Sequence, residues 1–260
     1  MKIATWNVNS LRVRLPHVLD WLAANAVDVL CLQETKTEDA GFPFADLQAA
    51  GYNVVHNGQK TYNGVAILAR APLLETQRDL TDFADEQKRL IAATVSGVRV
   101  ICAYMPNGSE VGSDKYAYKL RWLAALQREL EAALQRWPLL VLCGDFNIAP
   151  EDRDVHDPLA WRGRILCSDP EREFFRGFIA AGCRDAFRLF EQPADSFSWW
   201  DYRNAAFRRN LGLRIDHLLL SADLAAACRE CVVDKGPRRL QRPSDHAPVI
   251  ARLDLPQEDA

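Results

Sequence analysis

The chain has 260 residues, of which 48% are hydrophobic and 26% are charged, so we expect a globular protein with a sizeable core. A formal net charge of -3 and a pI near 6.0 exclude binding to nucleic acid through bulk positive charge, so any polyanion site must be local. No apolar run is long enough to span a membrane and the first residues do not resemble a signal peptide, so we expect no membrane partner.

Short strand-like runs alternate with helical patterns along the chain, which is typical of a layered α/β protein. Helices are expected at 12–24 and 115–136, the second because leucines recur every three or four residues until Pro138 stops the pattern. A hairpin at 95–98 means that the sheets are not wholly parallel. No linker or repeat divides the chain, so we expect one domain over 1–260. Strands are expected at 2–6, 27–32, 52–56, 64–69, 90–95, 98–104, 139–143, 214–220 and 247–254.

The seven cysteines are an odd number, and three of them (Cys31, Cys102 and Cys143) lie in apolar runs, where a reduced thiol packs as a small hydrophobe. This usage favours a reducing, cytoplasmic setting. Cys228 and Cys231 have the spacing of a metal clip, but no second Cys or His pair accompanies them, so buried or surface thiols are favoured over a zinc site and the pair indicates no function.

Polar side chains follow several expected strands, where the edge of stacked sheets would bring them together. Asp145 and Asn147 come after the strand at 139–143, two residues apart and therefore on one side. Carboxylate and amide oxygens are hard ligands suited to magnesium, and Asp145 could also take a proton from water. Alone, an Asp-x-Asn sequence after a strand is more often a simple turn.

A histidine and two carboxylates lie at the ends of further expected strands. Asp245 and His246 precede the last expected strand, and Asp216 lies near the start of the strand expected at 214–220. A carboxylate that orients His246 would raise its pKa and let it serve as a general acid or bind an oxyanion. The alternatives are a structural histidine and a strand-edge ion pair.

Three other strand ends carry Asn7, Glu34 and Tyr104, which completes a set of acid, amide, phenol and imidazole groups. The sequence has no serine nucleophile elbow, phosphate-binding glycine loop or cysteine nucleophile setting. Metal-assisted hydrolysis is therefore the chemistry that fits best. Basic residues gather at 203–214 and 235–242, where either phosphate contacts or a solvated loop would explain them.

Six segments together resemble the exonuclease III family of the endonuclease/exonuclease/phosphatase superfamily, in order and spacing from residue 2 to about 254. They are Trp6-Asn7-Val8-Asn9-Ser10-Leu11-Arg12, Leu32-Gln33-Glu34-Thr35-Lys36, Gly144-Asp145-Phe146-Asn147-Ile148-Ala149-Pro150, Ser198-Trp199-Trp200-Asp201-Tyr202-Arg203, Gly212-Leu213-Arg214-Ile215-Asp216 and Ser244-Asp245-His246-Ala247-Pro248. The resemblance implies a four-layer α/β sandwich, in which two mixed β-sheets pack face to face between flanking helices, with the site at one sheet edge.

The resemblance also implies roles for individual residues. Those that would hold Mg²⁺, or Mn²⁺ as a substitute, directly or through a neighbouring contact, are Asn7, Glu34, Asp145, Asn147 and Asp245. The catalytic set would be Tyr104, Asp145, Asn147, Asp216 and His246. In that set Asp145 positions or deprotonates the attacking water, Asp216 holds His246, and His246 and Tyr104 stabilise the transition state.

For DNA recognition, Trp200, Leu213 and Ile215 match positions of a small apolar pocket for a base-less sugar, with Trp199 and Phe207 nearby; ordinary core packing is the alternative. Phosphate contacts are expected from Arg89, Lys115, Lys119, Arg203 and Arg208. The segment 157–164 lies where relatives differ. Bulk there could narrow the entry to internal abasic sites and leave processing of 3′ ends dominant.

The implied function is a Mg²⁺-dependent repair enzyme for double-stranded DNA with abasic sites, nicks or blocked 3′ ends. Its activities would be 3′-to-5′ exonuclease, 3′-phosphatase or 3′-phosphodiesterase, and class II apurinic/apyrimidinic (AP) endonuclease. One alternative is a phosphoinositide or sphingomyelin phosphodiesterase of the same superfamily, which the aromatic segment 198–203 disfavours. Another is an inactive nucleic-acid-binding module, which the filled catalytic positions disfavour. We expect a monomer that is cytoplasmic and works at the bacterial nucleoid.

Overall fold

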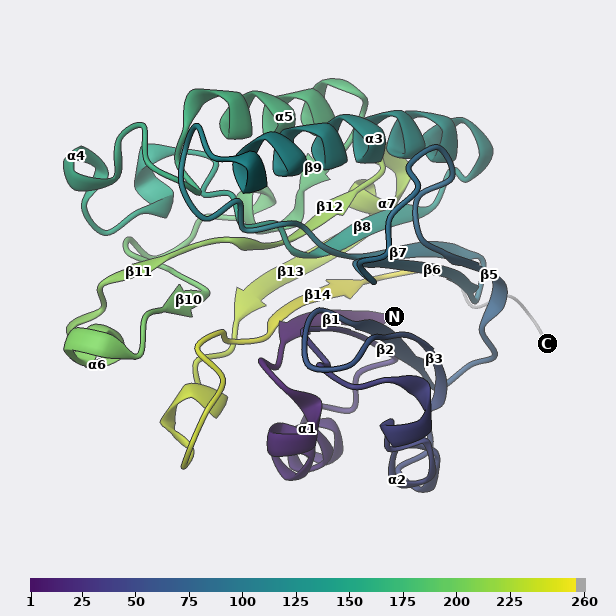
Figure 1. Ribbon diagram of the computed structural model, residues 1–260. Coiled ribbons are helices and arrows are strands. Elements are labelled where there is room, and N and C mark those ends of the chain that lie inside the picture. The colour runs from purple at the N-terminus through teal and green to yellow at the C-terminus, as the bar shows by residue number, and fades with distance from the viewer. Residues whose placement is uncertain (256–260) are drawn as a thin grey trace.

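The structure is a computed structural model that describes residues 1–255. Two six-stranded mixed sheets pack face to face, and helices cover the outer face of each sheet (Figure 1). The four-layer α/β sandwich expected from the sequence is therefore confirmed. No helix within residues 1–255 has both the length and the apolar character needed to cross a membrane.

The first sheet contains both ends of the described chain and has the order β13-β14-β1-β2-β4-β3. Its central strand β1 runs parallel to β2 and antiparallel to β14. The helices α1 (Leu11–Asn25) and α2 (Phe44–Ala49) lie on its outer face (Figure 1). The strands are β1 (Lys2–Asn7), β2 (Val29–Gln33), β3 (Asn53–Asn57), β4 (Val65–Ala69), β13 (Cys228–Val233) and β14 (Val249–Leu253).

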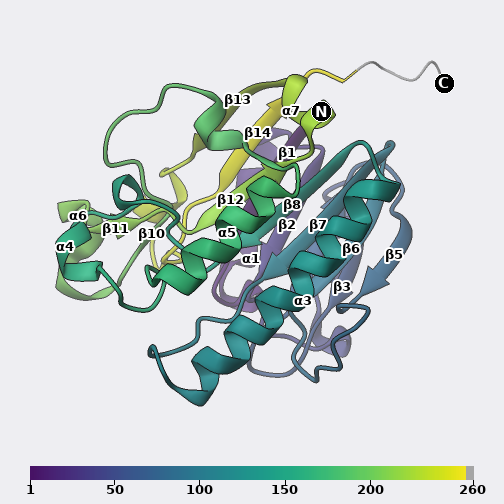
Figure 2. The same ribbon diagram turned by 90° about the horizontal axis from the view of Figure 1, so that it is seen from above.

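The second sheet has the order β5-β6-β7-β8-β12-β9, with β7 and β8 parallel. The helices α3 (Asp114–Arg136) and α5 (Asp169–Ala180) lie side by side over it (Figure 2). The strands are β5 (Leu74–Arg78), β6 (Leu90–Val95), β7 (Val98–Tyr104), β8 (Leu140–Asp145), β9 (Arg184–Asp185) and β12 (Asp216–Leu220). Outside both sheets lie the ribbon β10 (Trp199–Trp200) with β11 (Gly212–Leu213) and the short helices α4 (Pro158–Trp161), α6 (Ala206–Arg209) and α7 (Ala222–Ala226).

Side chains point alternately to the two faces of each strand, so the core has three layers: one between the two sheets and one between each sheet and its helices. In β8, Val141 and Cys143 face the other sheet, whereas Leu140 and Leu142 face α3 and α5. Burying both faces requires a continuous apolar run, which explains why β8 could be recognised in the sequence. The same β8 run delivers Asp145 to the edge of the sheet, beside the end of β7.

The expected elements are present with boundaries shifted by at most two residues. The strand expected at 214–220 starts at Asp216, because Gly212–Leu213 pairs instead with the β10 ribbon. The strands β5 and β13, which were not expected, lie at sheet edges, and each is interrupted by a bulge. Cys228 and Cys231 turn inward from β13 as buried free thiols.

Candidate active site

The ends of β1, β2, β7, β8 and β12 meet at one edge of the two sheets, and their polar side chains form one cluster. Asn7 bridges the sheets, since its Nδ2 donates to Glu34 Oε1 and to Asp145 Oδ2, each at 2.9 Å. Ligand atoms of Glu34, Asp145 and His246 all lie within 4.8 Å of one another. Residues far apart in sequence therefore converge as the strand-end pattern predicted.

The loop after β8 is shaped to aim Asp145 into this cluster. Gly144 has φ +145°, and a Cβ there would lie 1.8 Å from the carbonyl oxygen of Ala103, so only glycine lets β7 and β8 approach this closely. The main-chain N–H of Asn147 donates to Asp145 Oδ1 at 2.9 Å, and Asn147 Nδ2 donates to the Met105 carbonyl at 3.0 Å. Both oxygens of Asp145 are thus held by amide donors, and Oδ2 faces Asn7 and His246.

His246 is held between two carboxylates. Its Nδ1 lies 2.9 Å from Asp216 Oδ2, and its Nε2 lies 3.7 Å from Asp145 Oδ2. Burial would lower the pKa of His246, but the charges of Asp216 and Asp145 outweigh burial and raise it to about 10. Ser198 Oγ donates to Asp216 Oδ2 at 2.6 Å and keeps that carboxylate in place. The imidazole is therefore protonated at neutral pH, with Nε2–H directed toward the reaction centre.

The pKa values of Asp145 and Tyr104 are both raised above their ordinary values. Burial, with the neighbouring charges of Asp216 and Glu34, raises the pKa of Asp145 to about 7, although His246 and Asn7 oppose that shift. Burial, with the charges of Glu34 and Asp145, raises the pKa of the Tyr104 phenol well above its usual value. Tyr104 therefore stays a neutral hydrogen-bond donor, and Asp145 can exchange a proton near neutral pH.

The donor set fits a hard divalent cation. Glu34 and Asp145 offer carboxylate oxygens, the ligands that Mg²⁺ prefers, whereas Asn7 Oδ1 accepts from the main-chain N–H of Asn9 at 3.0 Å. Burial is the main reason why the pKa of Asp145 is raised, the charges of Asp216 and Glu34 add to it, and a cation would relieve that part of the repulsion. The individual ligand assignments remain predictions.

Asp245 stands slightly apart from this cluster. Its carboxylate accepts hydrogen bonds from Asn9 Nδ2 and Trp199 Nε1, both at 2.9 Å. Asn9 Oδ1 accepts in turn from Lys36 Nζ at 2.6 Å, and Lys36 forms an ion pair with Glu34 at 2.8 Å. Asp245 is thus linked to Glu34 through two side chains, a placement that suits a supporting contact better than direct ligation.

Several of these supporting residues were not selected from the sequence. They are Asn9, Lys36, Asn107 and Ser198. All but Asn107 lie inside the motif segments quoted above, so their position next to a functional residue was the available signal. Asn107 follows β7, and its Nδ2 donates to Asn147 Oδ1 at 3.0 Å.

The expected sugar pocket must be corrected in one residue. Neighbouring residues of a strand point to opposite faces. Trp199 pairs with Leu213 and packs against Ile215, whereas Trp200 is fully buried on the other face, edge-on to Phe207. Trp199, not Trp200, therefore stands with the two aliphatic residues.

The expected phosphate contact of Lys119 is wrong. Its ammonium group is fully buried and forms an ion pair with Glu171, which is also fully buried. Arg89 is mostly buried and lies over the Tyr104 ring, 4.8 Å from its centroid, at the side of a polar cleft of about 400 Å³ that Lys115 also lines. Arg203 and Arg208 are exposed beside α6, where Arg203 pairs with Asp201 at 2.6 Å. Phosphate contacts by these four cations remain predictions.

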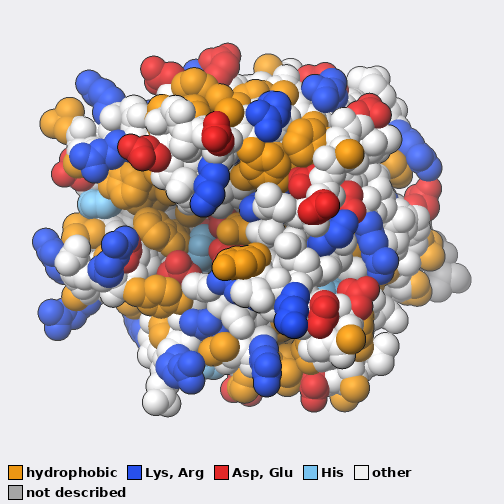
Figure 3. Space-filling view, in the orientation of Figure 1, with side chains coloured by type: hydrophobic (Ala, Val, Ile, Leu, Met, Phe, Trp, Pro, Cys, Tyr) orange, Lys and Arg blue, Asp and Glu red, His pale blue; other side chains and the backbone are white. Residues whose placement is uncertain are grey.

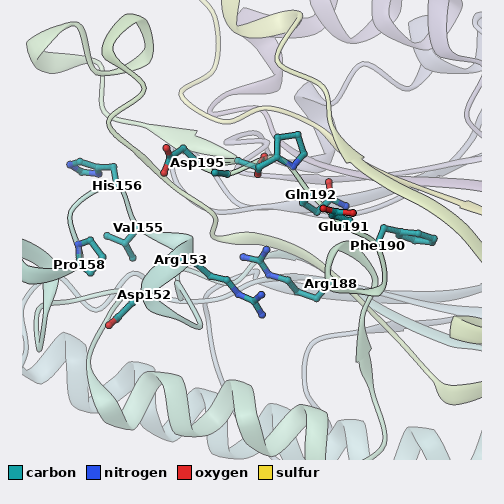
Figure 4. A pocket seen from close by; sticks show the side chains of 13 residues that line it. Asp152, Arg153, Val155, His156, Pro158, Arg188, Phe190, Glu191, Gln192 and Asp195 are labelled. Atoms are coloured by element: carbon teal, nitrogen blue, oxygen red, sulfur yellow. Dashed lines mark hydrogen bonds between the residues drawn. The ribbon is translucent and has the colours of Figure 1, made fainter.

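The surface around the site is hollowed, with acidic and histidine side chains in its floor and Lys and Arg side chains around it (Figure 3). A separate cavity of about 660 Å³ lies between the turn at 152–154 and the loop at 190–196 (Figure 4). Arg153, Arg188, His156 and Asp195 line it, and none of the predicted catalytic residues does. The predicted chemistry thus belongs to the sheet edge and not to this cavity.

A four-layer sandwich with buried carboxylates and a doubly held histidine at its edge defines a metal-dependent hydrolase of the phosphoesterase type. The family model "Endonuclease/Exonuclease/phosphatase family" matches residues 4–246, and the chain belongs to that family. The chain is 37% identical to exodeoxyribonuclease III of Haemophilus influenzae, over 97% of this chain and 100% of that protein.

Solved structures agree with this assignment. The 3′ phosphatase NExo from Neisseria, bound to a product DNA hairpin, is 49% identical and superimposes with a TM-score of 0.97 over 98% of this chain and 100% of that chain. An AP endonuclease from Archaeoglobus fulgidus is 39% identical, with a TM-score of 0.94 over 98% of this chain and 100% of that chain. The resemblance to exonuclease III expected from the sequence is confirmed.

Proposed function

We propose that this chain is a Mg²⁺-dependent phosphoesterase of DNA repair that acts mainly on blocked 3′ ends of double-stranded DNA, as a 3′-phosphatase and 3′-phosphodiesterase. The observation that carries the proposal is the position of Asp145, whose Oδ2 accepts from Asn7 at 2.9 Å and lies 3.7 Å from His246 Nε2. A base and a cationic acid thereby stand side by side at the sheet edge. The names of the relatives reported above support DNA over a phosphoinositide or sphingomyelin headgroup.

In the proposed reaction Asp145 positions the attacking water and accepts its proton, and burial favours that protonation by raising the pKa of Asp145. His246, kept protonated by Asp216, and the neutral phenol of Tyr104 donate hydrogen bonds to the phosphoryl oxygens as negative charge develops. A divalent cation held by Glu34, Asn7 and Asp145 would neutralise part of that charge. Asn147 orients Asp145 through its main-chain and side-chain amides.

The preference for 3′ ends is supported by the state of the apolar pocket. Leu213 and Ile215, expected to receive a base-less sugar, are almost completely buried. They pack in one cluster with Trp161 and Ile165, which come from the segment following Val155, and with Trp199. A sugar flipped out of a duplex would have to displace these side chains, whereas a terminal 3′ group can reach Asp145 without entering the pocket.

The experiment compares three duplexes: one with a nick that carries a 3′-phosphate, one with a plain recessed 3′ end and one with an internal abasic analogue. Each is incubated with Mg²⁺, and parallel reactions contain EDTA. We expect fast loss of the 3′-phosphate, slower exonuclease action and the slowest cutting at the abasic analogue, with EDTA stopping all three. Faster cutting at the abasic analogue would contradict the 3′-end preference, and hydrolysis that persists in EDTA would contradict the metal-dependent reaction.

A further inference from the structure

We propose that Lys119 is a positioning residue, whose buried ammonium group fixes the two loops that carry Asn107 and Asn147 at the active site. The inference rests on the proposed function, because catalysis is one of the properties that it predicts will change. It replaces the DNA contact expected from the sequence with a contact inside the protein. Lys119 touches no reacting atom and acts only through the two asparagines.

The hydrogen bonding of Lys119 is complete within the protein. A lysine ammonium group has three N–H donors and no acceptor. Nζ donates to the main-chain carbonyl oxygen of Asn147 at 2.7 Å and to that of Asn107 at 3.2 Å, and the third partner is the carboxylate of Glu171. The residue is fully buried in α3, so its three donors point at protein oxygens and not at solvent.

The partner Glu171 is equally well satisfied. Besides Lys119, its carboxylate accepts from the main-chain N–H of Leu166 at 3.1 Å, and from the N–H and hydroxyl of Ser168 at 3.0 and 2.6 Å. Two charges that are fully buried together cost desolvation energy that apolar residues of similar size would avoid. Stability alone therefore does not explain this pair, whereas the geometry that it imposes on the two asparagine loops does.

The loops held by Lys119 face the reaction centre. Asn147 has φ +50°, a left-handed conformation that is uncommon for a residue other than glycine. Its carbonyl oxygen points to Lys119, while its side-chain Nδ2 points to Asp145 Oδ2 at 3.3 Å. Asn107 Nδ2 donates to Asn147 Oδ1 at 3.0 Å, so the side chains of the two loops are also joined. Loss of the Nζ contacts would free both carbonyls and loosen the hold of Asn147 on Asp145.

The test uses the full chain with Lys119→Met, Glu171→Gln and the double variant. Arg128→Met is the matched control, because Arg128 is exposed on the same helix and donates only to the Ala124 carbonyl one turn back. With Mg²⁺ and the 3′-phosphate duplex, kcat of Lys119→Met should fall by roughly 10- to 100-fold, the scale of a small misplacement of a catalytic group. KM should change by less than about twofold, since no DNA contact is lost.

Salt dependence separates positioning from phosphate binding. Each lost phosphate contact lowers the slope of log Kd against log salt concentration by about 0.9. The slope for Lys119→Met should equal that of the unmodified protein. A reduction by about 0.9 would overturn the inference, as would a kcat within twofold of the control.

The double variant separates positioning from simple loss of stability. Lys119→Met leaves the carboxylate of Glu171 buried without its cation, whereas the added Glu171→Gln change removes that charge. We therefore expect the double variant to regain melting temperature but not kcat. Recovery of both together would assign Lys119 a structural role only. If Lys119→Met does not fold, kcat and the salt dependence are measured on the double variant instead and compared with the same control.

An NMR measurement that does not depend on activity tests the role of Lys119 separately from the proposed function. The side-chain amide signal of Asn147 in a ¹⁵N spectrum, assigned by its loss in Asn147→Asp, should shift or broaden in both Lys119 variants and stay unchanged in Arg128→Met. An unchanged signal in the Lys119 variants overturns the inference. A shifted signal in a protein whose unmodified form does not hydrolyse DNA would sustain the inference and overturn the proposed function.

Discussion

Nε2 of His246 lies 3.7 Å from Oδ2 of Asp145, at the edge where the two sheets meet. In the proposed reaction Asp145 accepts a proton, whereas protonated His246 donates a hydrogen bond, and neighbouring groups shift the pKa of each. Asp216 keeps the imidazole charged, while burial makes the aspartate a weaker acid than usual. An acid and a base thus coexist at neutral pH within a few ångströms, which makes both residues targets for substitution.

Asp145→Asn should abolish hydrolysis while the fold is retained. The amide has the shape of the carboxylate but cannot accept a proton from water, and loss of a general base costs on the order of 10² to 10⁴ in rate. The measurement is kcat on the 3′-phosphate duplex, with far-UV circular dichroism as the control for folding. Turnover within tenfold of the unmodified protein would remove Asp145 from the role of base.

Asp216→Asn should move the alkaline limit of activity to lower pH. In the unmodified protein the pKa of His246 is raised to about 10, so the imidazolium persists through pH 9. Without the charge of Asp216, burial of the imidazole would lower that pKa, and the charged form would be lost earlier as the pH rises. The check is the pH profile of kcat between pH 6 and 10. An alkaline limb at the same pH in both proteins would show that Asp216 does not set the charge of His246.

Glu34→Gln should weaken Mg²⁺ binding more than it weakens DNA binding. A neutral amide replaces one of the carboxylates of the cluster, so affinity for the cation should fall by roughly tenfold or more. Isothermal titration with Mg²⁺ or Mn²⁺ measures the affinity, and excess metal should partly restore activity. Equal metal affinity in the two proteins would place the ion away from Glu34.

Trp161→Ala should increase cutting at an internal abasic analogue relative to removal of a 3′-phosphate. Trp161 packs in the cluster that fills the space beside Leu213 and Ile215, and its truncation would open that space to a sugar. The informative quantity is the ratio of the two rates on otherwise identical duplexes, which cancels any general loss of activity. A constant ratio would mean that the filled pocket does not govern the preference. Leu159→Ala, on the exposed side of the same helix, is the control.

His217→Gln should make the free energy of unfolding less dependent on pH between 7 and 4. Burial, together with the positive charge of the Arg214 guanidinium 3.0 Å from Nδ1, lowers the pKa of His217 to about 4, although the Ile148 carbonyl facing Nε2 opposes this shift. The unfolded chain therefore binds a proton below about pH 6.5 that the folded chain refuses until about pH 4, so acid removes stability in this window.

Between pH 7 and pH 4.5 the fall attributable to His217 is roughly 2 kcal/mol if its unfolded pKa is 6.5. Urea unfolding of both proteins at pH 7 and pH 4.5 measures it as the difference between their pH dependences. A variant that loses as much stability as the unmodified protein over this range would assign the acid sensitivity to other groups.

The sequence was most informative where a strand is buried on both faces and ends in a polar residue. The run before Asp145 is continuous and apolar, and its end predicts the position of the carboxylate. The edge strands β5 and β13 were not expected because their exposed positions carry polar residues and a bulge breaks their alternation.

Two site expectations failed for identifiable reasons. Lys119 shares the helical face of Leu123, Leu126 and Leu130, and this spacing indicated burial even though a lysine there suggested a phosphate contact. Trp199 and Trp200 are adjacent in a strand of two residues, too short for periodicity to determine which one faces the aliphatic pair.

Asn7 has a consequence for the stability of the whole protein. Its side chain joins Glu34, which follows a strand of the first sheet, to Asp145 at the end of a strand in the second. A cation held by these groups would bind only when both sheets are docked, so it would act as a clamp across the core and add to the free energy of unfolding by mass action. Metal affinity would then depend on how well the two sheets pack against each other. Mutations deep in that interface would lower the activity by weakening metal binding, without altering any catalytic side chain.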